Sequence, residues 1–534
     1  MLSQMVRRTP PETGPAEPPS GPQSDEGAED PGQSRRQIGH RRTVSRWDGL
    51  SLRRGLGQVR LGRLTPHHYG VGVLCALAAT AYSVMGLVKL HHFRATIFDL
   101  VIFDQAVRGY AGFGPPTTPA VGAFHGQGLD FLQLADHFSP ILAVLAPLYW
   151  IHAGPSTLIL AQSLLFALAI PPIWLFTRRK LGTVPAYLVA LTYATSAAIA
   201  QAAGFDFHEV AFVPVLTAVM IERLDRGRHL PVVLAAVGLL LVKEDMGLFV
   251  AGFGCYLLVT RRLRLGAAFV AAGLFAVALT RSVLIPAAGG DPATFWAFNQ
   301  LGTNVPGVLQ TMLTRPGFVL HTLVTPDIKL HTMLGLVWPL AFACLLSPLV
   351  IPALPMVLER MLSDRTFWWM DTFQYDAFVT VVLICAAVDG IARVQRLLNR
   401  GREPGTPTLA VAWAAAVCGI SLALVPQHYL GWLLKPSFYR APPDAAAAAA
   451  AAAVVPSGVV VDAVNNVGPA LTGRATVLLW EPRAHDVDWV VADTQRPAYP
   501  FSSLDEQAAK PDQLVAAGYR IVFQRDGYVV LHRP

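Results

Sequence analysis

Two aspartates in a short aromatic stretch are the first candidates for chemistry in this sequence. Asp99 and Asp104 lie in the segment Thr96-Ile97-Phe98-Asp99-Leu100-Val101-Ile102-Phe103-Asp104-Gln105. The apolar residues around them predict an amphipathic helix lying on a membrane surface. A carboxylate that is partly removed from water there can accept a proton from an incoming hydroxyl group. The spacing of Thr96 and Asp99 also fits a capping box, in which Asp99 would only start a helix.

Three further groups of polar residues follow along the chain, each beside an apolar segment. They are Asp136-His137-Phe138-Ser139-Pro140, Phe205-Asp206-Phe207-His208-Glu209 and Lys243-Glu244-Asp245. Because the loops that carry the last two groups are short, we expect these groups to converge with the first on one face of the molecule. Charges at a membrane boundary cost less than charges at its centre, so each group alone also fits ordinary interfacial residues or a helix cap.

Two cations and one possible metal site belong to this expected cluster. Lys243 and Arg94 are placed to neutralise a phosphate group, although Lys243 also fits a lysine that extends from an apolar helix towards water. Asp206, His208 and Glu209 offer oxygen and nitrogen ligands that a divalent cation can use. We therefore predict a polar cluster, with a divalent cation as a possible cofactor, while the pattern Asp-x-His-Glu defines no particular ion.

The composition indicates what kind of molecule must position these residues. The chain has 534 residues, of which 53% are hydrophobic and only 14% are charged. Soluble domains carry about 25% charged residues, so most of this chain is expected to lie in a membrane. The net charge of +7 does not indicate nucleic-acid binding, because much of the arginine stands at the ends of apolar segments. The five cysteines show no metal-ligand spacing and imply no disulfide framework.

Apolar segments long enough to be membrane spans recur along the chain. A span needs about 20 apolar helical residues, and this criterion predicts about eleven spans. They are expected near residues 69–90, 156–177, 184–203, 209–222, 229–243, 246–260, 265–286, 331–346, 348–358, 376–392 and 407–427. The fold class is therefore an α-helical polytopic membrane protein.

The distribution of basic residues predicts the orientation. Basic clusters occur in four loops, at Arg178-Arg179-Lys180, at Arg223, Arg226 and Arg228, at Arg261, Arg262 and Arg264, and at Arg393, Arg396, Arg400 and Arg402. Loops rich in Lys and Arg stay in the cytoplasm. The N-terminus is therefore expected on the cytoplasmic side of the membrane, and the C-terminus and the acidic loops on the outer side.

Both ends of the chain differ from the apolar middle. Residues 1–66 are rich in Pro, Gly, Ser and Arg and predict a disordered, basic cytoplasmic tail. Residues 67–438 form the expected membrane domain, with an outer loop at 91–137. From residue 439 to 534, a run of nine alanines behind Asp444 predicts a helix, and several β-rich segments follow. This end predicts a small extracytoplasmic α/β domain.

Taken in order, these segments resemble a bacterial membrane-protein family that carries only a domain-of-unknown-function label. The resemblance covers about residues 70–534. It rests on Phe98-Asp99-Leu100, Phe103-Asp104-Gln105, Asp136-His137-Phe138-Ser139-Pro140, Leu145-Ala146-Pro147-Leu148-Tyr149, Phe205-Asp206-Phe207-His208-Glu209, Lys243-Glu244-Asp245, Leu362-Ser363-Asp364-Arg365 and Asn465-Asn466. One departure is Phe373-Gln374-Tyr375-Asp376, where members of that family tend to have a His-Tyr pair.

That family is in turn similar to the GT-C glycosyltransferases, multi-span enzymes that use a polyprenyl-phosphate sugar. The resemblance implies a GT-C-like fold, with Asp99 or Asp104 as catalytic base and Lys243 near the donor phosphate. The expected function is transfer of a sugar, with inversion, from a polyprenyl-phosphate donor to an acceptor of the cell envelope, at the outer face of a bacterial plasma membrane. The expected partners are the lipid-linked sugar, membrane lipid and that acceptor, without nucleic acid.

Two other functions fit the same sequence. A transporter or lipid flippase would place functional charges deep in its spans and break helices near the membrane centre. A membrane scaffold without catalysis would present only the C-terminal domain to a cell-wall partner. The gathering of the acidic residues in outer loops favours the transferase.

Overall fold

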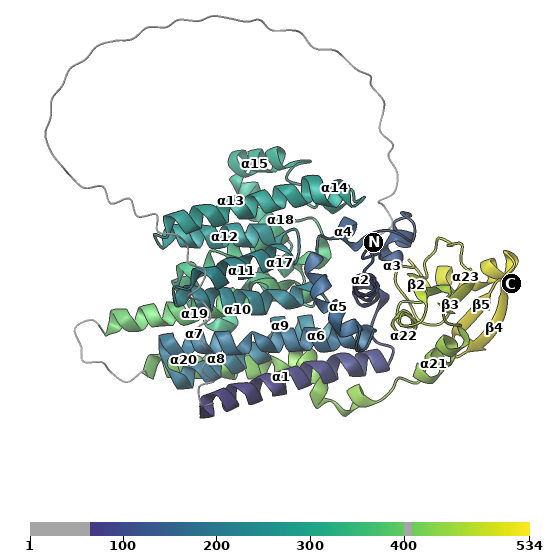
Figure 1. Cartoon of the computed structure of the whole chain (residues 1–534), viewed down its shortest axis with the longest axis horizontal. Coiled ribbons are helices and arrows are strands. Elements are labelled where there is room, and N and C mark those ends of the chain that lie inside the picture. Colours follow the sequence, from purple (N-terminus) through teal and green to yellow (C-terminus); the bar gives the residue numbers. More distant parts are fainter. Residues whose placement is uncertain (1–64, 400–407) are drawn as a thin grey trace, which may run out of the picture. The chain divides into compact units, whose positions relative to one another are not determined.

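The computed structural model describes residues 65–399 and 408–534, and residues Pro66–Pro534 form one compact unit of helices with a small sheet (Figure 1). The tail expected at residues 1–66 lies outside the described residues, except for its last two positions. The same holds for Arg400 and Arg402 of the fourth basic cluster.

Six helical segments are long and apolar enough to cross a membrane, and they confirm six of the expected spans. Their bounds are Pro66–His91 (α1), Pro155–Leu181 (α6 and α7), Thr183–Gly204 (α8 and α9), Leu263–Ala287 (α13 and α14), Gln374–Leu398 (containing α19) and Thr408–Gln427 (containing α20). Within these, α6 is Pro155–Leu168, α7 Ile170–Leu181, α8 Thr183–Thr195, α9 Ala197–Gly204, α13 Leu263–Leu279, α14 Ile285–Ala287, α19 Ala377–Leu398 and α20 Thr408–Leu424.

The remaining expected spans are short or broken, and a count of eleven is not confirmed. Helices α10 (Phe212–Asp225), α11 (His229–Leu240) and α12 (Met246–Val259) have 12 to 14 residues. Fourteen helical residues reach about 21 Å, less than the ~30 Å of a hydrocarbon layer.

The segment expected to span at 331–346 is interrupted. Helix α17 (Asp327–Val337) ends before 3-10 turns at Trp338–Leu340, Ala343–Leu346 and Pro348–Val350, and α18 (Ala353–Leu362) follows. Proline lacks the amide hydrogen that a helix interior needs, and Pro339 and Pro348 each stand in one of these turns. Ala341 and Phe342 between the turns have positive φ values of 52° and 57°.

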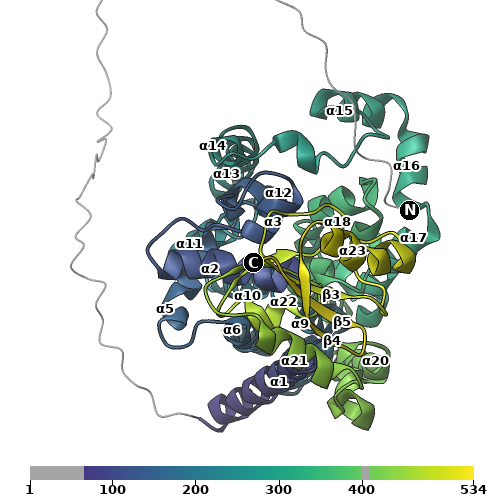
Figure 2. The same cartoon turned by 90° about the vertical axis from the view of Figure 1, so that its right-hand side faces the viewer.

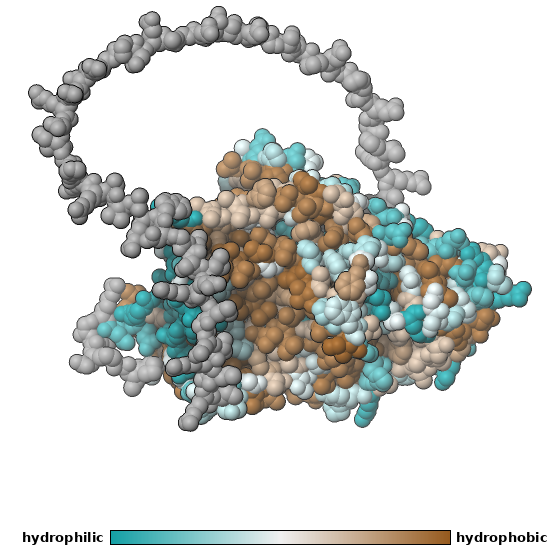
Figure 3. All heavy atoms as spheres, viewed as in Figure 1, coloured by the Kyte–Doolittle hydropathy of each residue, from teal (hydrophilic) through white to brown (hydrophobic). Residues whose placement is uncertain are grey.

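The apolar surface matches a membrane environment. Figure 3 shows mostly hydrophobic residues over the part of this face where Figure 1 places α10 to α13. Leu230 of α11 and Phe275 of α13 are 70% and 66% exposed, and such large apolar side chains are stable on a surface that contacts lipid.

The helix expected on the membrane surface is buried instead. The segment Ile97–Val101 forms one turn with irregular backbone, and α2 (Ile102–Ala111) follows it directly. Residues 102–107 are all buried. The apolar residues of this stretch therefore contact protein on several sides rather than lipid.

Shorter helices complete the chain between the spans. They are α3 (Pro119–Phe124), α4 (Gln133–Asp136), α5 (Ala146–Tyr149), α15 (Val305–Thr314) and α16 (Pro316–Val324). Helix α3 packs against strand β2 (Thr476–Leu479) of the C-terminal sheet.

The C-terminal segment forms the small sheet that its β-rich runs predict. Strands β1 (Val460–Ala463), β2 (Thr476–Leu479), β3 (Trp489–Asp493), β4 (Arg520–Arg525) and β5 (Tyr528–His532) lie in the order β2-β1-β3-β5-β4. The pairs of β1 with β2 and β3 are parallel, and β5 is antiparallel to both neighbours. Helices α21 (Ala445–Val454), α22 (Gly468–Leu471) and α23 (Leu504–Ala516) accompany the sheet (Figure 2).

Candidate charged site at the ends of the helices

Asp99 has an unusual backbone conformation at the junction between α1 and α2. Its φ and ψ are 84° and −68°, which match the positive-φ γ-turn, a rare and strained conformation for a residue with a Cβ. Thr96 makes no capping hydrogen bond to this turn, so the capping-box interpretation of Asp99 is wrong. The Asp99 side chain is 24% exposed and ion-paired with His208, with 3.0 Å between Oδ1 and Nε2.

From Asp99, a line of alternating charges leads into the protein. This charge line consists of Asp99, His208, Glu209 and Lys243. His208 Nδ1 lies 3.2 Å from Glu209 Oε2, and Lys243 Nζ lies 3.1 Å from Glu209 Oε1. The His208 amide donates to Gln162 Oε1 at 3.0 Å, which fixes the loop between α9 and α10. Three segments far apart in the sequence thus join their charges in one line.

The electrostatics of this line of charges favour the charged forms of its side chains. Burial alone would lower the pKa of His208, but the carboxylates of Asp99 and Glu209 outweigh it and raise the pKa to about 9. Burial alone would raise the pKa of Glu209, but Lys243 and His208 hold it well below its usual range. The pKa of Lys243 is raised because Glu209, Glu244 and Asp245 outweigh its burial.

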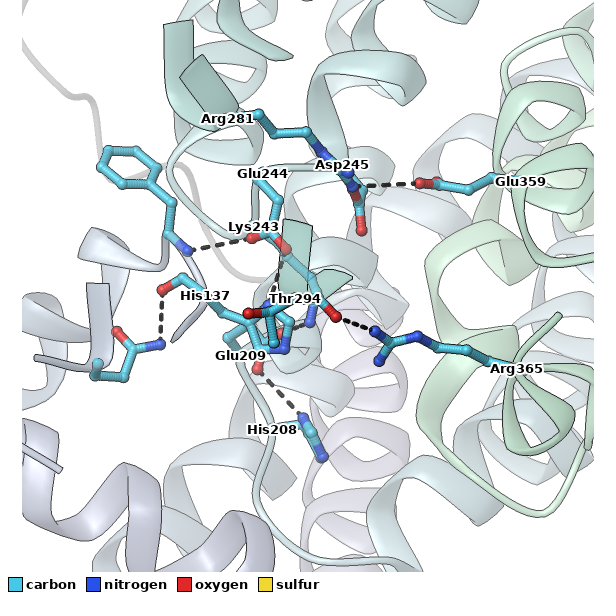
Figure 4. Close-up of polar contacts among 12 residues, drawn as sticks. His137, His208, Glu209, Lys243, Glu244, Asp245, Arg281, Thr294, Glu359 and Arg365 are labelled. Atoms are coloured by element: carbon cyan, nitrogen blue, oxygen red, sulfur yellow. Dashed lines mark hydrogen bonds and ion pairs between the residues drawn. The ribbon is translucent and has the colours of Figure 1, made fainter. Parts of the chain in front are cut away.

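A second branch of the cluster joins the loop of His137 and Phe138 to the loop of Glu244 (Figure 4). His137 Nδ1 lies 2.8 Å from Glu244 Oε1, and the Phe138 amide donates to Glu244 Oε2 at 3.1 Å. Burial and Lys243 oppose protonation of His137, but the Glu244 carboxylate outweighs them and raises its pKa. The Glu244 pair therefore connects the loop after α4 to the loop before α12.

Arg281 extends the cluster beyond Asp245. Arg281 lies 2.6 Å from Asp245 and 3.8 Å from Glu359. Arg365, from the Leu362-Ser363-Asp364-Arg365 motif, donates to the Thr294 carbonyl at 2.7 Å (Figure 4). Sequence spacing did not single out Arg281 or Glu359, because each lies in a different apolar segment from the Asp245 loop.

Asp206 supports the Asp99 turn rather than joining the charge line. Its Oδ2 accepts hydrogen bonds from the Thr96 amide at 3.0 Å and the Thr96 hydroxyl at 2.6 Å. Its Oδ1 lies 3.4 Å from Lys89 Nζ, and Lys89 also donates to the Gly204 and Phe205 carbonyls. Lys89 is not among the residues that the sequence predicts for the site. A lysine in the last turn of a span was its only signal.

Asp104, the alternative base, is a buried structural carboxylate. It is 0% exposed, and Tyr149 Oη and Thr472 Oγ1 donate to its two oxygens at 2.7 and 2.8 Å. Arg108 is its ion-pair partner at 3.0 Å. A carboxylate with both oxygens occupied and no contact with solvent has no room for an acceptor hydroxyl.

Two other expected site residues, Arg94 and Asp136, are not members of the charge line. Arg94 donates to the carbonyls of Phe438 and Arg440 at 3.0 and 3.1 Å, which ties the end of α1 to the linker before α21. Asp136 ends α4 and is half-buried beside His137.

Aromatic rings cover the His208 end of the charge line. Phe205 stacks on the His208 ring with 6.0 Å between centroids, and Phe373 meets Phe205 edge-on at 5.1 Å. Phe373 is the first residue of the segment Phe373-Gln374-Tyr375-Asp376, in which a His-Tyr pair was expected, so this segment contacts the ring that stacks on His208.

Within residues 65–399 and 408–534, no group of three or more His, Cys, Asp or Glu side chains is arranged to hold a metal ion. The oxygens of Asp206 face Thr96 and Lys89, and those of Glu209 face His208 and Lys243. The three side chains expected as a ligand set therefore point towards protein partners.

A cavity of about 620 Å³ lies close by but is separate from the charge line. The ends of α1 and α6 and the helices α21 and α22 line it, with Leu90, His92, Ser156, Ala445 and Pro469 among its residues. Neither Asp99 nor His208 lines this cavity. Its wall is rich in alanine and contains no carboxylate, and His91, His92 and His152 supply most of its polar side-chain atoms.

These features define an integral membrane protein with a charged cluster at the ends of its helices, beside a small C-terminal sheet. The chain belongs to the family described as "Predicted membrane protein (DUF2079)", whose model matches residues 89–530. No curated protein sequence matches the chain.

Several solved structures are similar over most of the chain. ArnT from Cupriavidus metallidurans bound to undecaprenyl phosphate is 14% identical, with a TM-score of 0.49 over 87% of this chain and 98% of that chain. An oligosaccharyltransferase from Archaeoglobus fulgidus tethered to an acceptor peptide is 12% identical, with a TM-score of 0.41 over 85% and 72%. AglB from Archaeoglobus fulgidus with an inhibitory peptide and a dolichol-phosphate is also 12% identical, with a TM-score of 0.41 over 88% and 74%.

Proposed function

We propose that this protein is a GT-C-like glycosyltransferase that moves a sugar from a polyprenyl-phosphate donor to an acceptor outside the cytoplasm. The observation that carries the proposal is Asp99, a partly exposed carboxylate in a strained turn, paired with one histidine at the head of a buried charge line. Strained backbone is concentrated at functional sites. An exposed oxygen on a fixed carboxylate is what a general base needs.

In the proposed reaction Asp99 takes the proton of an acceptor hydroxyl. The hydroxyl oxygen then attacks the anomeric carbon, the bond from that carbon to the phosphate oxygen breaks, and the polyprenyl phosphate leaves with the electron pair. A single displacement of this kind inverts the anomeric centre. Interactions that strengthen as the leaving phosphate gains charge accelerate such a step.

The cations of the cluster are the proposed partners of the leaving phosphate. Lys243 is charged and held in the cluster by Glu209. Arg365, in the loop after α18, is a second candidate, and its guanidinium group donates to the Thr294 carbonyl (Figure 4). Arg94 is the less suitable candidate, because its guanidinium group already donates to two backbone carbonyls.

The test is sugar transfer by the purified full chain in lipid nanodiscs. A set of synthetic polyprenyl-phosphate sugars is incubated with wild-type protein, Asp99→Asn and Asp130→Asn, and release of free sugar to water is measured alongside transfer. Asp130 is the matched control because it is an exposed carboxylate of the same outer loop. Wild type and Asp130→Asn are expected to consume the donor and Asp99→Asn to fail. Equal consumption by all three would remove Asp99 from the mechanism.

A requirement of the proposed reaction for a divalent cation can be tested directly. The same assay is run after treatment with EDTA and after addition of Mg²⁺ or Mn²⁺. Activity that is lost with EDTA and restored by one ion would assign a cofactor, and unchanged activity would assign none.

The proposed reaction also requires the cluster to lie on the outer face, with the N-terminus in the cytoplasm. Single cysteines at Asp130 and Arg228, both exposed, are introduced into a cysteine-free chain in intact bacterial cells. A membrane-impermeant maleimide is expected to label Asp130→Cys and not Arg228→Cys. The reverse pattern would place the cluster inside and contradict the orientation.

A transporter or flippase is the second candidate, and the broken segment between α17 and α18 is the observation that favours it. Two residues with positive φ and three 3-10 turns interrupt this segment, as expected for a broken transporter helix. Movement of a polyprenyl-phosphate lipid across sealed vesicles without covalent transfer would support this candidate over the transferase.

A further inference from the structure

The turn that carries Asp99 is shared between two hydrophobic cores. Ile97, Val101 and Ile102 are buried in the core of the C-terminal sheet. Leu100 and Phe103 are buried in the core of the membrane helices. Asp99 therefore lies at the boundary of two packed units, and its position depends on how firmly each unit holds the turn.

Asn465 supplies a direct contact from the C-terminal side. The Ile97 amide donates to both the carbonyl oxygen and the side-chain Oδ1 of Asn465, at 3.0 and 2.8 Å. Gly468, at the start of α22, lies so close to Ile97 that a Cβ built on it would overlap the Ile97 side chain. The loop between β1 and α22 thus follows the backbone of the turn at contact distance.

The other end of the turn is also anchored by the C-terminal segment. Thr472 Oγ1 donates to Asp104 at 2.8 Å, and Gln105 Nε2 donates to the Val477 carbonyl at 2.8 Å. Asp99 therefore lies between two anchors, both provided by residues 465–477.

These anchors explain how Asp99 keeps its strained conformation. A sparsely populated backbone conformation is unfavourable by itself, and it persists only when the surroundings of the residue determine it. On the N-terminal side Asp206 holds the amide of Thr96 and Asn465 holds the amide of Ile97. Without the second contact the turn is free to relax towards ordinary helical or extended angles.

We infer that Asn465 is a positioning residue that fixes the proposed base Asp99 through the Ile97 amide. The C-terminal domain then helps to position the catalytic base through a direct contact with the backbone next to it. This inference rests on the proposed function for its catalytic consequence, whereas the contact itself can be tested without any activity.

The first experiment measures amide hydrogen exchange in the full chain in nanodiscs, in peptides that cover residues 95–103. Asn465→Ala leaves only the backbone acceptor, and loss of one hydrogen bond predicts about fivefold to tenfold faster exchange. Asn465→Asp keeps an oxygen acceptor and is expected to restore protection. Asn466→Ala is the matched control, because Asn466 donates to Tyr528 Oη inside the C-terminal domain.

Two outcomes of this experiment would overturn the inference. One is unchanged exchange at residues 95–103 in Asn465→Ala. The other is equally faster exchange in Asn466→Ala, which would mean that any loosening of the C-terminal domain has the same effect.

The second experiment measures donor consumption by the same variants. Asn465→Ala is expected to lower kcat about tenfold with an unchanged KM for the donor, and Asn465→Asp is expected to recover most of the loss. A rise in KM with unchanged kcat would contradict a role in positioning the base. If wild-type protein consumes no donor, the proposed function fails, while the exchange result still decides whether Asn465 holds the turn.

Discussion

The two ends of helix α10 carry dense charge, but they are built in different ways. Glu209 precedes the helix at the end that faces Asp99, and Glu222 lies in its last turns. Both glutamates are almost completely buried, with side chains 1% exposed. The comparison between them separates charge that serves structure from charge that is available for chemistry.

At the Glu222 end, three arginines surround one carboxylate. Arg226, Arg179 and Arg223 lie 2.6, 2.7 and 3.2 Å from its oxygens. In the same region, Lys180 forms ion pairs with Asp225 and Asp389, at 2.9 and 3.6 Å. These cations come from the basic loops that are expected in the cytoplasm.

At the Glu209 end, opposite charges alternate from Lys243 to Asp99 and leave the last carboxylate at the surface. Asp99 has His208 as its ion-pair partner and is 24% exposed, and its backbone is strained. Dense charge is therefore no sufficient signal for a site, since both ends have it. Incomplete pairing, partial exposure and backbone strain occur together only at the Asp99 end of this comparison.

Replacement of Asp99 should give the largest effect. A positioned general base contributes about 10²–10⁴-fold to a rate, so Asp99→Asn should lower donor consumption by that factor. Its melting temperature in detergent should fall only moderately, because Asp99 is partly exposed and Glu209 still pairs with His208. A parallel loss of activity and melting temperature would mean that Asp99 supports the fold rather than the chemistry.

The same chemical change at the two ends of α10 sharpens the comparison. Breaking a buried ion pair costs about 3–5 kcal/mol, so Glu209→Gln and Glu222→Gln should both lower the melting temperature. Only Glu209→Gln should also change kcat, because Glu209 sets the charge of His208 and Lys243. Loss of kcat in well-folded Glu222→Gln protein would remove the distinction between the two ends.

The pH dependence of stability should also differ between the ends. The fold raises the pKa of His208 from 6.5 to about 9, so it favours the protonated form. This contribution, of the order of 3 kcal/mol, is complete below pH 6.5 and disappears as the pH rises through about 9. His208→Gln should therefore flatten the melting-temperature profile between pH 6.5 and 9. A His208→Gln profile that falls as steeply as wild type would show that another group titrates there.

The smallest effect is expected at Arg94. Its two hydrogen bonds to backbone carbonyls contribute about 1 kcal/mol each, and one is exposed. Arg94→Ala should lower the melting temperature slightly and leave the KM for a polyprenyl-phosphate donor unchanged. A large rise in that KM would return Arg94 to the donor site.

The sequence by itself determined the membrane class, six spans and the small C-terminal sheet, because these depend on local composition and on periodicity. It also identified the loops of Asp99, His208, Glu209 and Lys243, since charges between apolar segments are conspicuous. Spans that are short or interrupted, such as the segment after Val337, were not resolved, because an apolar run looks the same whether or not its helix is broken.

Only the tertiary structure decided which carboxylate is exposed and which is buried. Asp99 and Asp104 lie in one aromatic stretch with equal claims, but Tyr149 and Thr472 occupy the second and leave the first at the surface. Lys89 and Arg281 entered the site only through contacts with residues distant in sequence. The Asn465-Asn466 motif was visible in the sequence, but only the contact of Asn465 with Ile97 gave it a role. Such contacts depend on how the helices and the C-terminal sheet pack, and no local pattern encodes that packing.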